Sequence, residues 1–472
     1  MIGSMHIKAL SKMVDPNGVT TDPVTLEPFV TEWRDKFVGK TPLMLSPKTT
    51  DEAAKIIGYC NQHGIAIVPQ GGNTGLVGGG IPGLENADEI LLSTRRMTAT
   101  PVVNPSGFTL VAEAGCTVST MQEAATEQSR LFGLSLASEG SCTAGGVAST
   151  NAGGVHVIRY GTTRAMILGV EAVMPDGTVI DELSGLSKDN TGYPLSQLMI
   201  GAEGTLGLIT KVCFRLFPME LSRATAWLAV PSPSAALELL SKARELSEDQ
   251  VSVFELVRRS ALEFTYRHIP GTRDPLAGIS PWYVLIETAS SAANSAVSDR
   301  MQALLESSLA AKLITDGAIA QSLDQRALFW RNRESISEAQ KLEGGSIKHD
   351  ISVPLGQIAT FIETTTKLLE QTYSDIRVTP FGHLGDGNLH FNVMQPENGD
   401  KNAFLNHWEA MNRLVHDQVI AHGGSISAEH GIGVLKKEEL ARTKPPAEMA
   451  IMRALKNAID PNNIMNPRCL FD

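Results

Sequence analysis

The first half of the chain alternates short apolar runs with amphipathic segments. Residues 50–63 carry apolar side chains at helical spacing, which predicts a helix capped by Thr49 or Thr50. Apolar runs bounded by glycine, proline or polar residues predict strands at 65–69, 89–94, 109–114, 169–174, 178–180 and 206–217. This half is therefore predicted to mix helices and strands.

In the second half, glycines become rarer and long amphipathic helices follow short strands. The predicted strands are 224–230, 282–288 and 346–353, and the predicted helices are 234–246, 295–309, 355–373 and 402–422. This alternation predicts an α+β (or α/β) sheet with helices on one face. The change in composition places a domain boundary near Pro218.

A dense glycine run, QGGNTGLVGGGIPG, occupies Gln70–Gly83. So many glycines cannot form a regular helix or strand, and their unshielded N–H groups can form a concave site for a diphosphate. The part GGGIPG has the spacing of a dinucleotide-binding loop. A strand rather than a helix follows it, however, and Pro82 lies inside it, which argues against that interpretation. The alternative is a flexible surface loop.

A second glycine-rich segment, GSCTAGGVASTNAGG, spans Gly140–Gly154 and adds hydroxyl groups to the same design. Small side chains allow a flat ring to approach the backbone closely, and the hydroxyl groups can form hydrogen bonds to it. Two such loops in one domain predict a large cofactor that carries phosphate groups.

The motif GHLGDGNLHFNV predicts two short strands joined by a GDGN turn, which would bring His383 and His390 together. The motif SAEHGIG adds the neighbours Glu429 and His430. Two histidines and a carboxylate are a frequent open site for zinc or iron(II), where a substrate can fill a free position. Alternatively, these are unrelated strand histidines and a capping glutamate.

A third cluster, FWRNRESISEAQ followed by SIKHD, contains the cations Arg333 and Lys348. On a helix, Arg333 and Ser337 lie four residues apart and share a face. That face and Lys348 can bind a carboxylate through charge-assisted hydrogen bonds. The alternative is a solvated helix face with an ordinary salt bridge.

Composition and charge narrow the class of protein. The formal net charge of −11 over 472 residues argues against nucleic acid as a partner, although local cations can still bind a small anion. Five dispersed cysteines without a CxxC pair predict reduced thiols. Without a signal peptide or a membrane-spanning apolar run, we expect the cytoplasm, or an organelle matrix after removal of a targeting peptide.

Five segments in fixed order carry a family resemblance: PQGGNTGLVGG, SEGSCTAGGVASTNAGG, GAEGTLGLIT, GHLGDGNLHFNV and SAEHGIG. Together they resemble the FAD-linked D-2-hydroxyacid dehydrogenases, which are flavoproteins of the vanillyl-alcohol oxidase type. The resemblance is greater to the members that oxidise D-2-hydroxyglutarate than to those that oxidise D-lactate. It implies an FAD-binding domain of two subdomains at 1–218, an α+β substrate (cap) domain with the metal site at 219–425, and a C-terminal segment at 426–472 that returns to the flavin.

The resemblance also implies bound FAD. The first loop would wrap the diphosphate and the second would line the flavin. Some relatives attach FAD covalently through a histidine at the place where this chain has Asn73, so the FAD here is expected to be non-covalent. The implied FAD-binding residues are Pro69, Gln70, Gly71, Gly72, Asn73, Thr74, Gly75, Gly78, Gly79, Ser138, Gly140, Cys142, Thr143, Gly146, Ser149, Asn151, Gly153, Glu203, Gly204, Gly207 and Ile209.

The resemblance further assigns a metal site and a substrate site. The implied ligands of Zn²⁺, or of another divalent metal, are His383, His390 and Glu429. The implied substrate-binding residues are Arg333, Ser337, Lys348, Asn392 and His430. Ser337 stands where the D-2-hydroxyglutarate enzymes of the family carry threonine, so the hydroxyl group is kept.

The implied reaction is oxidation of a D-2-hydroxy acid, in the nearest case D-2-hydroxyglutarate to 2-oxoglutarate. Flavin N5 would accept the hydride and His430 the proton, since an ordinary histidine pKa near 6.5 suits a general base. The electron acceptor would be an electron-transfer flavoprotein or a quinone, and a homodimer is compatible with this class. Alternatives are a D-lactate dehydrogenase and a non-catalytic electron-relay flavoprotein, which would not need the metal and base residues.

Overall fold

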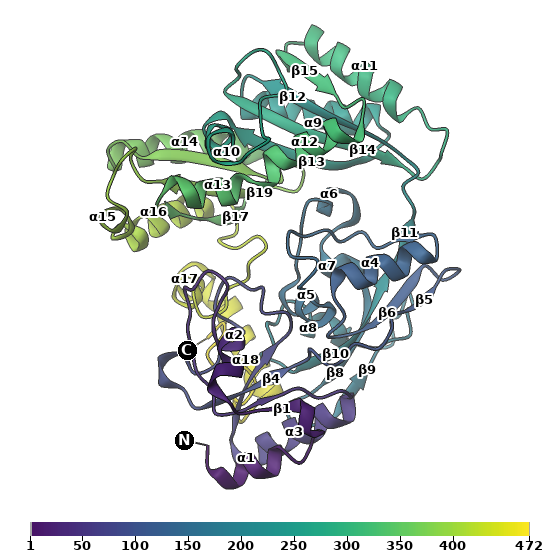
Figure 1. Cartoon of the computed structure of the whole chain (residues 1–472), viewed down its shortest axis with the longest axis vertical. Coiled ribbons are helices and arrows are strands. Elements are labelled where there is room, and N and C mark those ends of the chain that lie inside the picture. The colour runs from purple at the N-terminus through teal and green to yellow at the C-terminus, as the bar shows by residue number, and fades with distance from the viewer. Residues whose placement is uncertain (1, 472) are drawn as a thin grey trace. The chain divides into compact units, whose positions relative to one another are not determined.

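The computed structural model describes residues 2–471 and forms two compact units, each built from separate stretches of the chain (Figure 1). The first unit combines Met1–Gly153, Gly161–Met219 and His430–Asp472. The second unit combines Gly154–Tyr160 and Glu220–Glu429.

This division differs from the expected one at two places. The returning C-terminal segment begins at His430 rather than at residue 426, and Gly154–Tyr160 joins the second unit. Arg159 accounts for the second difference, because its guanidinium donates to the carbonyl oxygens of Gln250 and Ala289 in that unit. One anchoring side chain leaves no compositional change for a sequence pattern to detect.

The first unit contains a parallel β-α-β arrangement. It consists of β2 (Met44–Leu45), α3 (Thr50–His63) and β3 (Ala66–Gln70), in a sheet of order β1-β2-β4-β3 with β1 (Val19–Thr20) and β4 (Glu89–Ser93). The helix predicted at 50–63 is confirmed, and Thr49 caps it, since its hydroxyl oxygen accepts the Glu52 N–H. The C-terminal segment returns to this sheet, because Ile67 forms a parallel bridge with Met465: the Ile67 N–H donates to the Ile464 carbonyl, and the Ile67 carbonyl accepts the Asn466 N–H.

A second, antiparallel sheet of the first unit has the order β5-β6-β10-β8-β9. Its strands are β5 (Val102–Asn104), β6 (Thr109–Glu113), β10 (Leu208–Arg215), β8 (Ile167–Val173) and β9 (Val179–Asp181). The strands predicted in the first half are confirmed to within two residues at each end. The turn between β8 and β9 is confirmed too, with Gly177 at a φ of +86° and its N–H bonded to the Met174 carbonyl.

The second glycine-rich segment is not wholly a loop, which corrects the sequence interpretation. Residues Ala144–Thr150 form the short helix α5, whose first turn is capped by the Thr143 hydroxyl. Gly145 explains the glycine content, because a Cβ there would lie 2.7 Å from the Ala114 side chain. Glycine therefore serves close packing between a helix and the strand end.

Smaller elements complete the first unit. They are α1 (Ser4–Leu10), η1 (Pro16–Gly18), α2 (Pro23–Val30), η2 (Leu84–Asn86), α4 (Val118–Glu127), β7 (Arg130–Leu131), α7 (Thr163–Met166), α8 (Leu195–Met199), β11 (Phe217–Pro218), α17 (Lys437–Thr443) and α18 (Pro446–Ile459).

The second unit is built on one large antiparallel sheet of order β15-β12-β14-β13-β18-β19-β16, with β17 also paired to β19. The strands are β12 (Ser222–Val230), β13 (Val251–Arg258), β14 (Trp282–Ser290), β15 (Asp316–Ile319), β16 (Ser346–Ile347), β17 (Asp350–Ser352), β18 (Arg377–Gly382) and β19 (Asn388–Met394). The helices are α6 (Val157–Tyr160), α9 (Pro233–Leu246), α10 (Arg259–His268), α11 (Val297–Ala310), α12 (Leu323–Glu334), α13 (Ile336–Glu343), η3 (Leu355–Gln357), α14 (Ile358–Thr372), α15 (Lys401–Leu405) and α16 (Trp408–Ala421).

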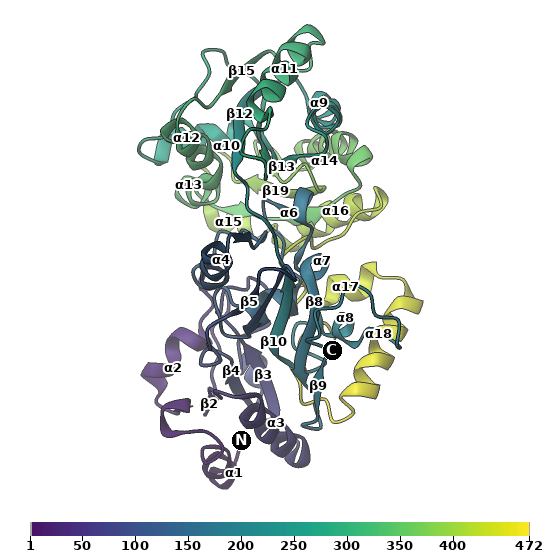
Figure 2. The same ribbon diagram turned by 90° about the vertical axis from the view of Figure 1, so that its right-hand side faces the viewer.

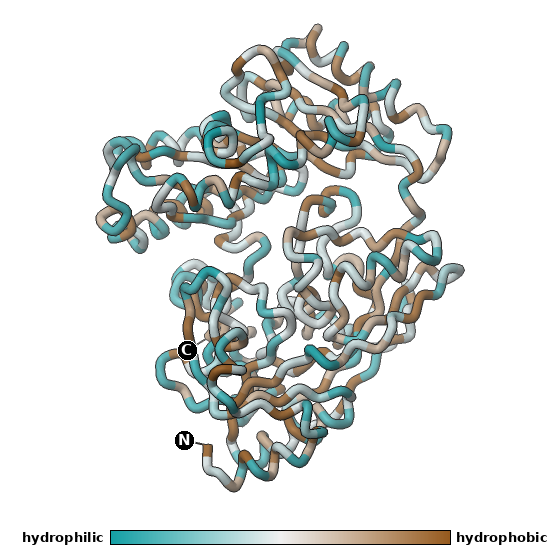
Figure 3. The backbone as a smooth tube through the Cα atoms, in the orientation of Figure 1, coloured by the Kyte–Doolittle hydropathy of each residue, from teal (hydrophilic) through white to brown (hydrophobic). Residues whose placement is uncertain are grey.

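Helices cover both faces of this sheet, so the expectation of a single covered face was wrong (Figure 2). On one face, Leu262 of α10, Phe329 of α12 and Ile336 of α13 share a buried cluster with Trp227 and Tyr283. On the other face, α9 packs on β13 and α11 on β12. Figure 3 shows hydrophobic and hydrophilic residues alternating along α11, as expected for a helix with one buried side.

Two predicted elements are interrupted. The strand expected at 346–353 is divided into β16 and β17, although its register continues, with Ile347 opposite Val393 and Asp350 opposite His390. The helix expected at 402–422 is divided into α15 and α16 around His407. Within residues 2–471, no helix combines the length and the apolar composition that a membrane crossing requires.

Candidate active site

The first glycine loop leaves β3 and closes on itself. Gln70, at the end of β3, donates from its side-chain amide to the carbonyl oxygens of Phe29 and Gly80. A Cβ on Gly72 would overlap the Ser141 carbonyl oxygen. The two glycine segments therefore pack directly against each other, and glycine is required where they meet.

Other glycines of these segments border open space. A Cβ at Gly75 or at Gly140 would meet nothing within 4 Å. Asn73 adopts a φ of +54° and donates its amide N–H groups to the carbonyl oxygens of Pro28 and Thr31. Bare backbone beside open space fits a large cofactor with phosphate groups and a flat ring.

The residues predicted to bind FAD lie in three segments of the first unit. Those of the first segment, at the end of β3 and in the loop after it, are Pro69, Gln70, Gly71, Gly72, Asn73, Thr74, Gly75, Gly78 and Gly79. Those of the second segment, before, on and after α5, are Ser138, Gly140, Cys142, Thr143, Gly146, Ser149, Asn151 and Gly153. Those of the third segment, before and at the start of β10, are Glu203, Gly204, Gly207 and Ile209. The Glu203 N–H joins the last two segments by donating to the Ser149 carbonyl.

The carboxylate of Glu203 contacts protein backbone. It accepts the Ile432 N–H at 2.8 Å and the Gly433 N–H at 2.7 Å, and burial raises the pKa of this carboxyl group. A Cβ on Gly431, which has a φ of +81°, would lie 2.8 Å from the same carboxylate. Glu203 therefore fixes the backbone that directly follows His430.

The predicted hairpin brings the two metal-binding candidates of GHLGDGNLHFNV together. Phe381 of β18 lies opposite His390 of β19, and His383 follows directly after β18. The turn between the strands is closed by the Asp386 carboxylate, which accepts the Asn388 N–H at 3.0 Å. The expectation that the turn would place both imidazoles side by side is consistent with ring centroids 5.4 Å apart.

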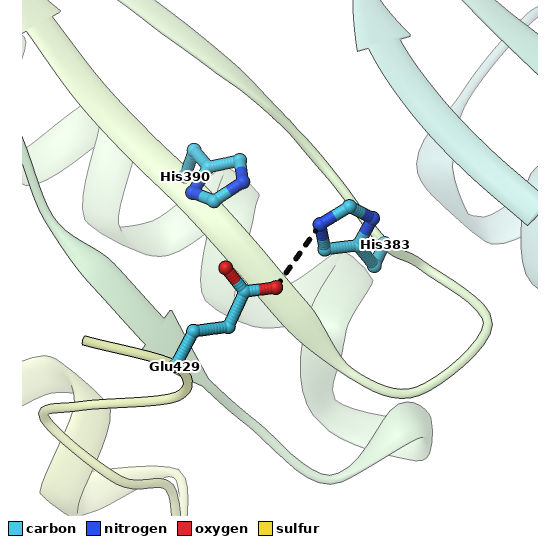
Figure 4. Close-up of side chains that lie close together, drawn as sticks. All are labelled: His383, His390 and Glu429. Carbon is cyan, nitrogen blue, oxygen red and sulfur yellow. Dashed lines mark ion pairs between the residues drawn. The ribbon is translucent and has the colours of Figure 1, made fainter. Parts of the chain in front are cut away.

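Glu429 completes the group. Its Oε1 lies 3.2 Å from His383 Nε2, and one ligand atom from each of His383, His390 and Glu429 lies within 4.8 Å of the others. Figure 4 shows both rings and the carboxylate pointing into the same space. Two imidazoles and one carboxylate at this separation fit a divalent metal such as zinc with a position left for another ligand.

The protonation states within this group differ. Burial opposes charge on His383, but the Glu255 and Glu429 carboxylates raise the pKa of His383 well above its usual 6.5. Burial lowers the pKa of His390 to about 4, so its ring is neutral at pH 7 and can offer a lone pair. The group therefore holds one positive charge on His383 that a metal cation could replace.

Two further carboxylates support the group, and sequence reasoning did not single out either. Glu255 of β13 is fully buried and accepts both from His383 Nδ1 and from Arg333. Asp350 of β17 accepts the Glu429 N–H at 2.9 Å. For Glu255, the available sign was a lone acidic residue within an apolar strand, because a buried carboxylate requires partners.

The predicted substrate residues are only partly grouped. Arg333 is buried at the end of α12, whereas Ser337 is exposed on α13. The expectation that both share one helix face was wrong, because the helix is interrupted at Ser335. Arg333 is also paired, with its Nε and Nη2 each 2.6 Å from one Glu255 oxygen, and it shares this carboxylate with His383.

Two of the remaining three substrate candidates, Asn392 and Lys348, lie opposite each other in the register of the sheet. Asn392 of β19 is buried and donates to the Gln340 side-chain oxygen at 2.9 Å. Lys348 lies between β16 and β17, where the register on either side places it opposite Asn392. His430 directly follows Glu429 and begins the final stretch of the first unit.

Comparison with known proteins gives the family. Residues 42–182 match the family model of an FAD binding domain, and residues 220–470 match that of the C-terminal domain of FAD linked oxidases. The chain is 37% identical over 467 residues to the mitochondrial D-2-hydroxyglutarate dehydrogenase of Arabidopsis thaliana, which covers 99% of this chain and 81% of the relative. It is 38% identical over 464 residues to a Schizosaccharomyces pombe protein provisionally named a mitochondrial D-lactate dehydrogenase, covering 96% of this chain and 86% of the relative.

A solved structure shows the fold. The structure of p-cresol methylhydroxylase with substrate bound superposes with a TM-score of 0.77 at 15% sequence identity, covering 99% of this chain and 96% of the other. This likeness confirms the expected fold of the vanillyl-alcohol oxidase type. With the two matched domains and the relatives that span nearly the whole chain, it follows that the protein belongs to the FAD-linked oxidase family, as an oxidoreductase of the group that includes the D-2-hydroxyglutarate dehydrogenases.

Proposed function

We propose that the protein oxidises a D-2-hydroxy acid with FAD, and that its preferred substrate is D-2-hydroxyglutarate, which becomes 2-oxoglutarate. The observation that carries this proposal is the grouping of His383, His390 and Glu429 with Arg333 through Glu255. This arrangement sets a metal-type donor set beside a cation that can bind a carboxylate. The name of the Arabidopsis relative supports the choice of substrate.

The cofactor and the metal would have different roles in the reaction. Bound FAD would supply the acceptor for the hydride from C2, and a bound zinc ion would supply a Lewis acid that makes the substrate hydroxyl more acidic. The glycine segments of the first unit would hold the FAD, and His383, His390 and Glu429 the metal. Iron(II) or manganese also suits this donor set.

The side chains of the chain would orient the substrate and remove its proton. His430 would accept the proton of the C2 hydroxyl as general base. Arg333 keeps Nη1 without a partner among the described residues, so it can donate to a substrate carboxylate although its other nitrogens hold Glu255. Lys348 supplies the second cation, and with Ser337 and Asn392 it would complete the substrate site.

A dicarboxylate is the favoured substrate because the site offers two cations and a metal for the anionic groups. A D-lactate dehydrogenase is the second candidate, supported by the provisional name of the yeast relative. A non-catalytic electron relay would need the FAD loops alone, and the grouped ligands of the second unit speak against it.

The electron acceptor would be a partner such as an electron-transfer flavoprotein or a quinone, and the protein would work as a homodimer. The relatives named above are mitochondrial by name, which supports an organelle matrix as the location.

The test is a steady-state panel with a dye as electron acceptor. D-2-hydroxyglutarate, D-malate, D-lactate, glycolate and the L enantiomers would be compared at one FAD and zinc loading. We expect the highest kcat/KM for D-2-hydroxyglutarate and no turnover of the L enantiomers. An equal or higher kcat/KM for D-lactate would contradict the assignment.

A further inference from the structure

We propose that Glu255 is a positioning residue that sets the affinity for the metal and for the substrate carboxylate together. The inference rests on the proposed function, because it assumes that His383 binds a metal and that Arg333 binds the substrate. Glu255 touches neither of those ligands in this scheme and acts through both side chains.

The position of Glu255 leaves it no access to water. It lies on β13 between β14 and β18, with Leu285 of β14 opposite it, and its exposed fraction is 0%. It faces the side of the sheet that is covered by α12, because Val253 and Val257, two residues away on either side, belong to the same cluster as Phe329. A carboxylate in such a place must be satisfied entirely by protein groups.

The two oxygens of Glu255 serve different partners. Oε1 accepts from His383 Nδ1, and Oε2 accepts from Nε and Nη2 of Arg333 at 2.6 Å. Both partners are themselves almost fully buried. The carboxylate therefore holds the metal-ligand histidine and the arginine at a fixed separation.

The contact to His383 selects which ring nitrogen is available. When a metal replaces the Nε2 hydrogen, the Nδ1 hydrogen would stay with Glu255 and the Nε2 lone pair would bind the metal, since Nε2 is the atom that lies 3.2 Å from Glu429. A carboxylate behind a metal-bound histidine fixes the ring and makes it a stronger ligand, and its loss typically lowers metal affinity about 10–100-fold.

The contact to Arg333 selects which guanidinium edge is available. Nε and Nη2 hold Glu255, which leaves Nη1 as the outward donor, and the Phe381 ring lies 4.8 Å from the guanidinium carbon on one face. A guanidinium held on two sides has one remaining direction for a carboxylate.

Glutamine cannot replace this residue. Its amide has one acceptor oxygen and one donor nitrogen, while both partners of Glu255 present donors. One of the two contacts is therefore lost in either orientation of the amide. Glu255→Gln should disturb the histidine or the arginine even though its shape is nearly unchanged.

The same sheet contains a matched control. Glu287, on the adjacent strand β14, is also 0% exposed and is held by Arg326, Trp330 and Thr225. None of these partners is a metal-ligand candidate. Glu287→Gln therefore removes a comparable buried charge without touching the proposed site.

The experiment compares Glu255→Gln, Glu287→Gln and the unchanged full-length protein, all loaded with FAD. Zinc affinity is measured by competition with a chelator dye, without turnover, and KM and kcat for D-2-hydroxyglutarate are then measured at saturating zinc. We expect Glu255→Gln to weaken zinc binding about 10–100-fold and to raise KM at saturating zinc. Glu287→Gln should lower the unfolding temperature and leave zinc affinity unchanged.

Unchanged zinc affinity in Glu255→Gln, or an equal loss in both variants, would overturn the inference. If Glu255→Gln does not fold, Glu255→Asp keeps the charge but is too short to serve both partners, and the same losses are expected of it. Failure of the proposed function has a different result: zinc affinity would still depend on Glu255, while no 2-hydroxy acid would be oxidised by the unchanged protein.

Discussion

The candidate site of the first unit is formed mainly by backbone, and that of the second unit by side chains. In the first unit, the two glycine segments meet backbone to backbone, and an added Cβ at Gly72 has no room. In the second unit, side chains from separated strands and helices meet, and Glu255 connects His383 with Arg333. The first site should therefore be sensitive to substitutions that add side-chain atoms, and the second to substitutions that remove a charged or hydrogen-bonding group.

The largest loss is expected at His430, the residue that directly follows the end of the second unit at Glu429. His430→Ala removes the proposed base, so kcat should fall by about 10²–10⁴ while metal content and bound FAD stay unchanged. Steady-state kinetics together with metal and flavin analysis measure this. Loss of zinc from the variant would mean that His430 is a metal ligand rather than the base.

A smaller loss of activity is expected when Arg333 is replaced by a residue with the same charge but a different shape. Arg333→Lys keeps the positive charge but cannot hold Glu255 from two nitrogens while donating to a substrate, so kcat/KM should fall about tenfold to a hundredfold. Arg331→Lys, at an exposed position of the same helix, is the control and should be neutral. Equal kinetics for both variants would show that Arg333 does not face the substrate.

In the first unit, the stability of the protein should be sensitive to an added side-chain atom. Gly72→Ala places a Cβ on the Ser141 carbonyl oxygen, which is backbone and cannot move easily, so the free energy of unfolding should fall by about 1–3 kcal/mol. Gly75→Ala, with nothing within 4 Å, should leave the stability of the FAD-free protein unchanged. Denaturant unfolding of both variants checks this, and similar stabilities would contradict the packing of the two segments.

The smallest effect concerns how the flavin is held. The Asn73 amide is bound to the Pro28 and Thr31 carbonyls and offers no nucleophile for attachment. Acid or heat should therefore release intact, yellow FAD into the supernatant. Flavin that remains with the precipitated protein would show a covalent link elsewhere.

The same contrast explains what the sequence could predict. The helix at 50–63 was predicted with both ends correct, because apolar side chains at helical spacing and a threonine cap mark it. The glycine segments and the histidine hairpin were found because their residue types are rare in regular elements. Each of these features lies within one short stretch of the chain.

Features that depend on distant partners were missed. Glu255 and Glu287 each interrupt an apolar strand, VSVFELVR and VLIETAS, in the same way, yet one meets His383 and the other Arg326. Which partner each glutamate meets depends on the order of the strands in the sheet, and the local sequence does not show that order. The interruption at Ser335 has neither proline nor glycine to mark it, so Arg333 and Ser337 were assigned to one helix face.

The central claim is that FAD and the metal are held by different units. The most direct test is to treat one sample with a chelator and to measure zinc, FAD and turnover of D-2-hydroxyglutarate before treatment, after it, and after Zn²⁺ is returned. We predict that zinc and turnover disappear together and return together while FAD stays bound throughout. His383→Ala should behave like the chelated protein, and His407→Ala, at an exposed histidine, like the untreated one. Full turnover without any metal, or release of FAD together with zinc, would contradict the account.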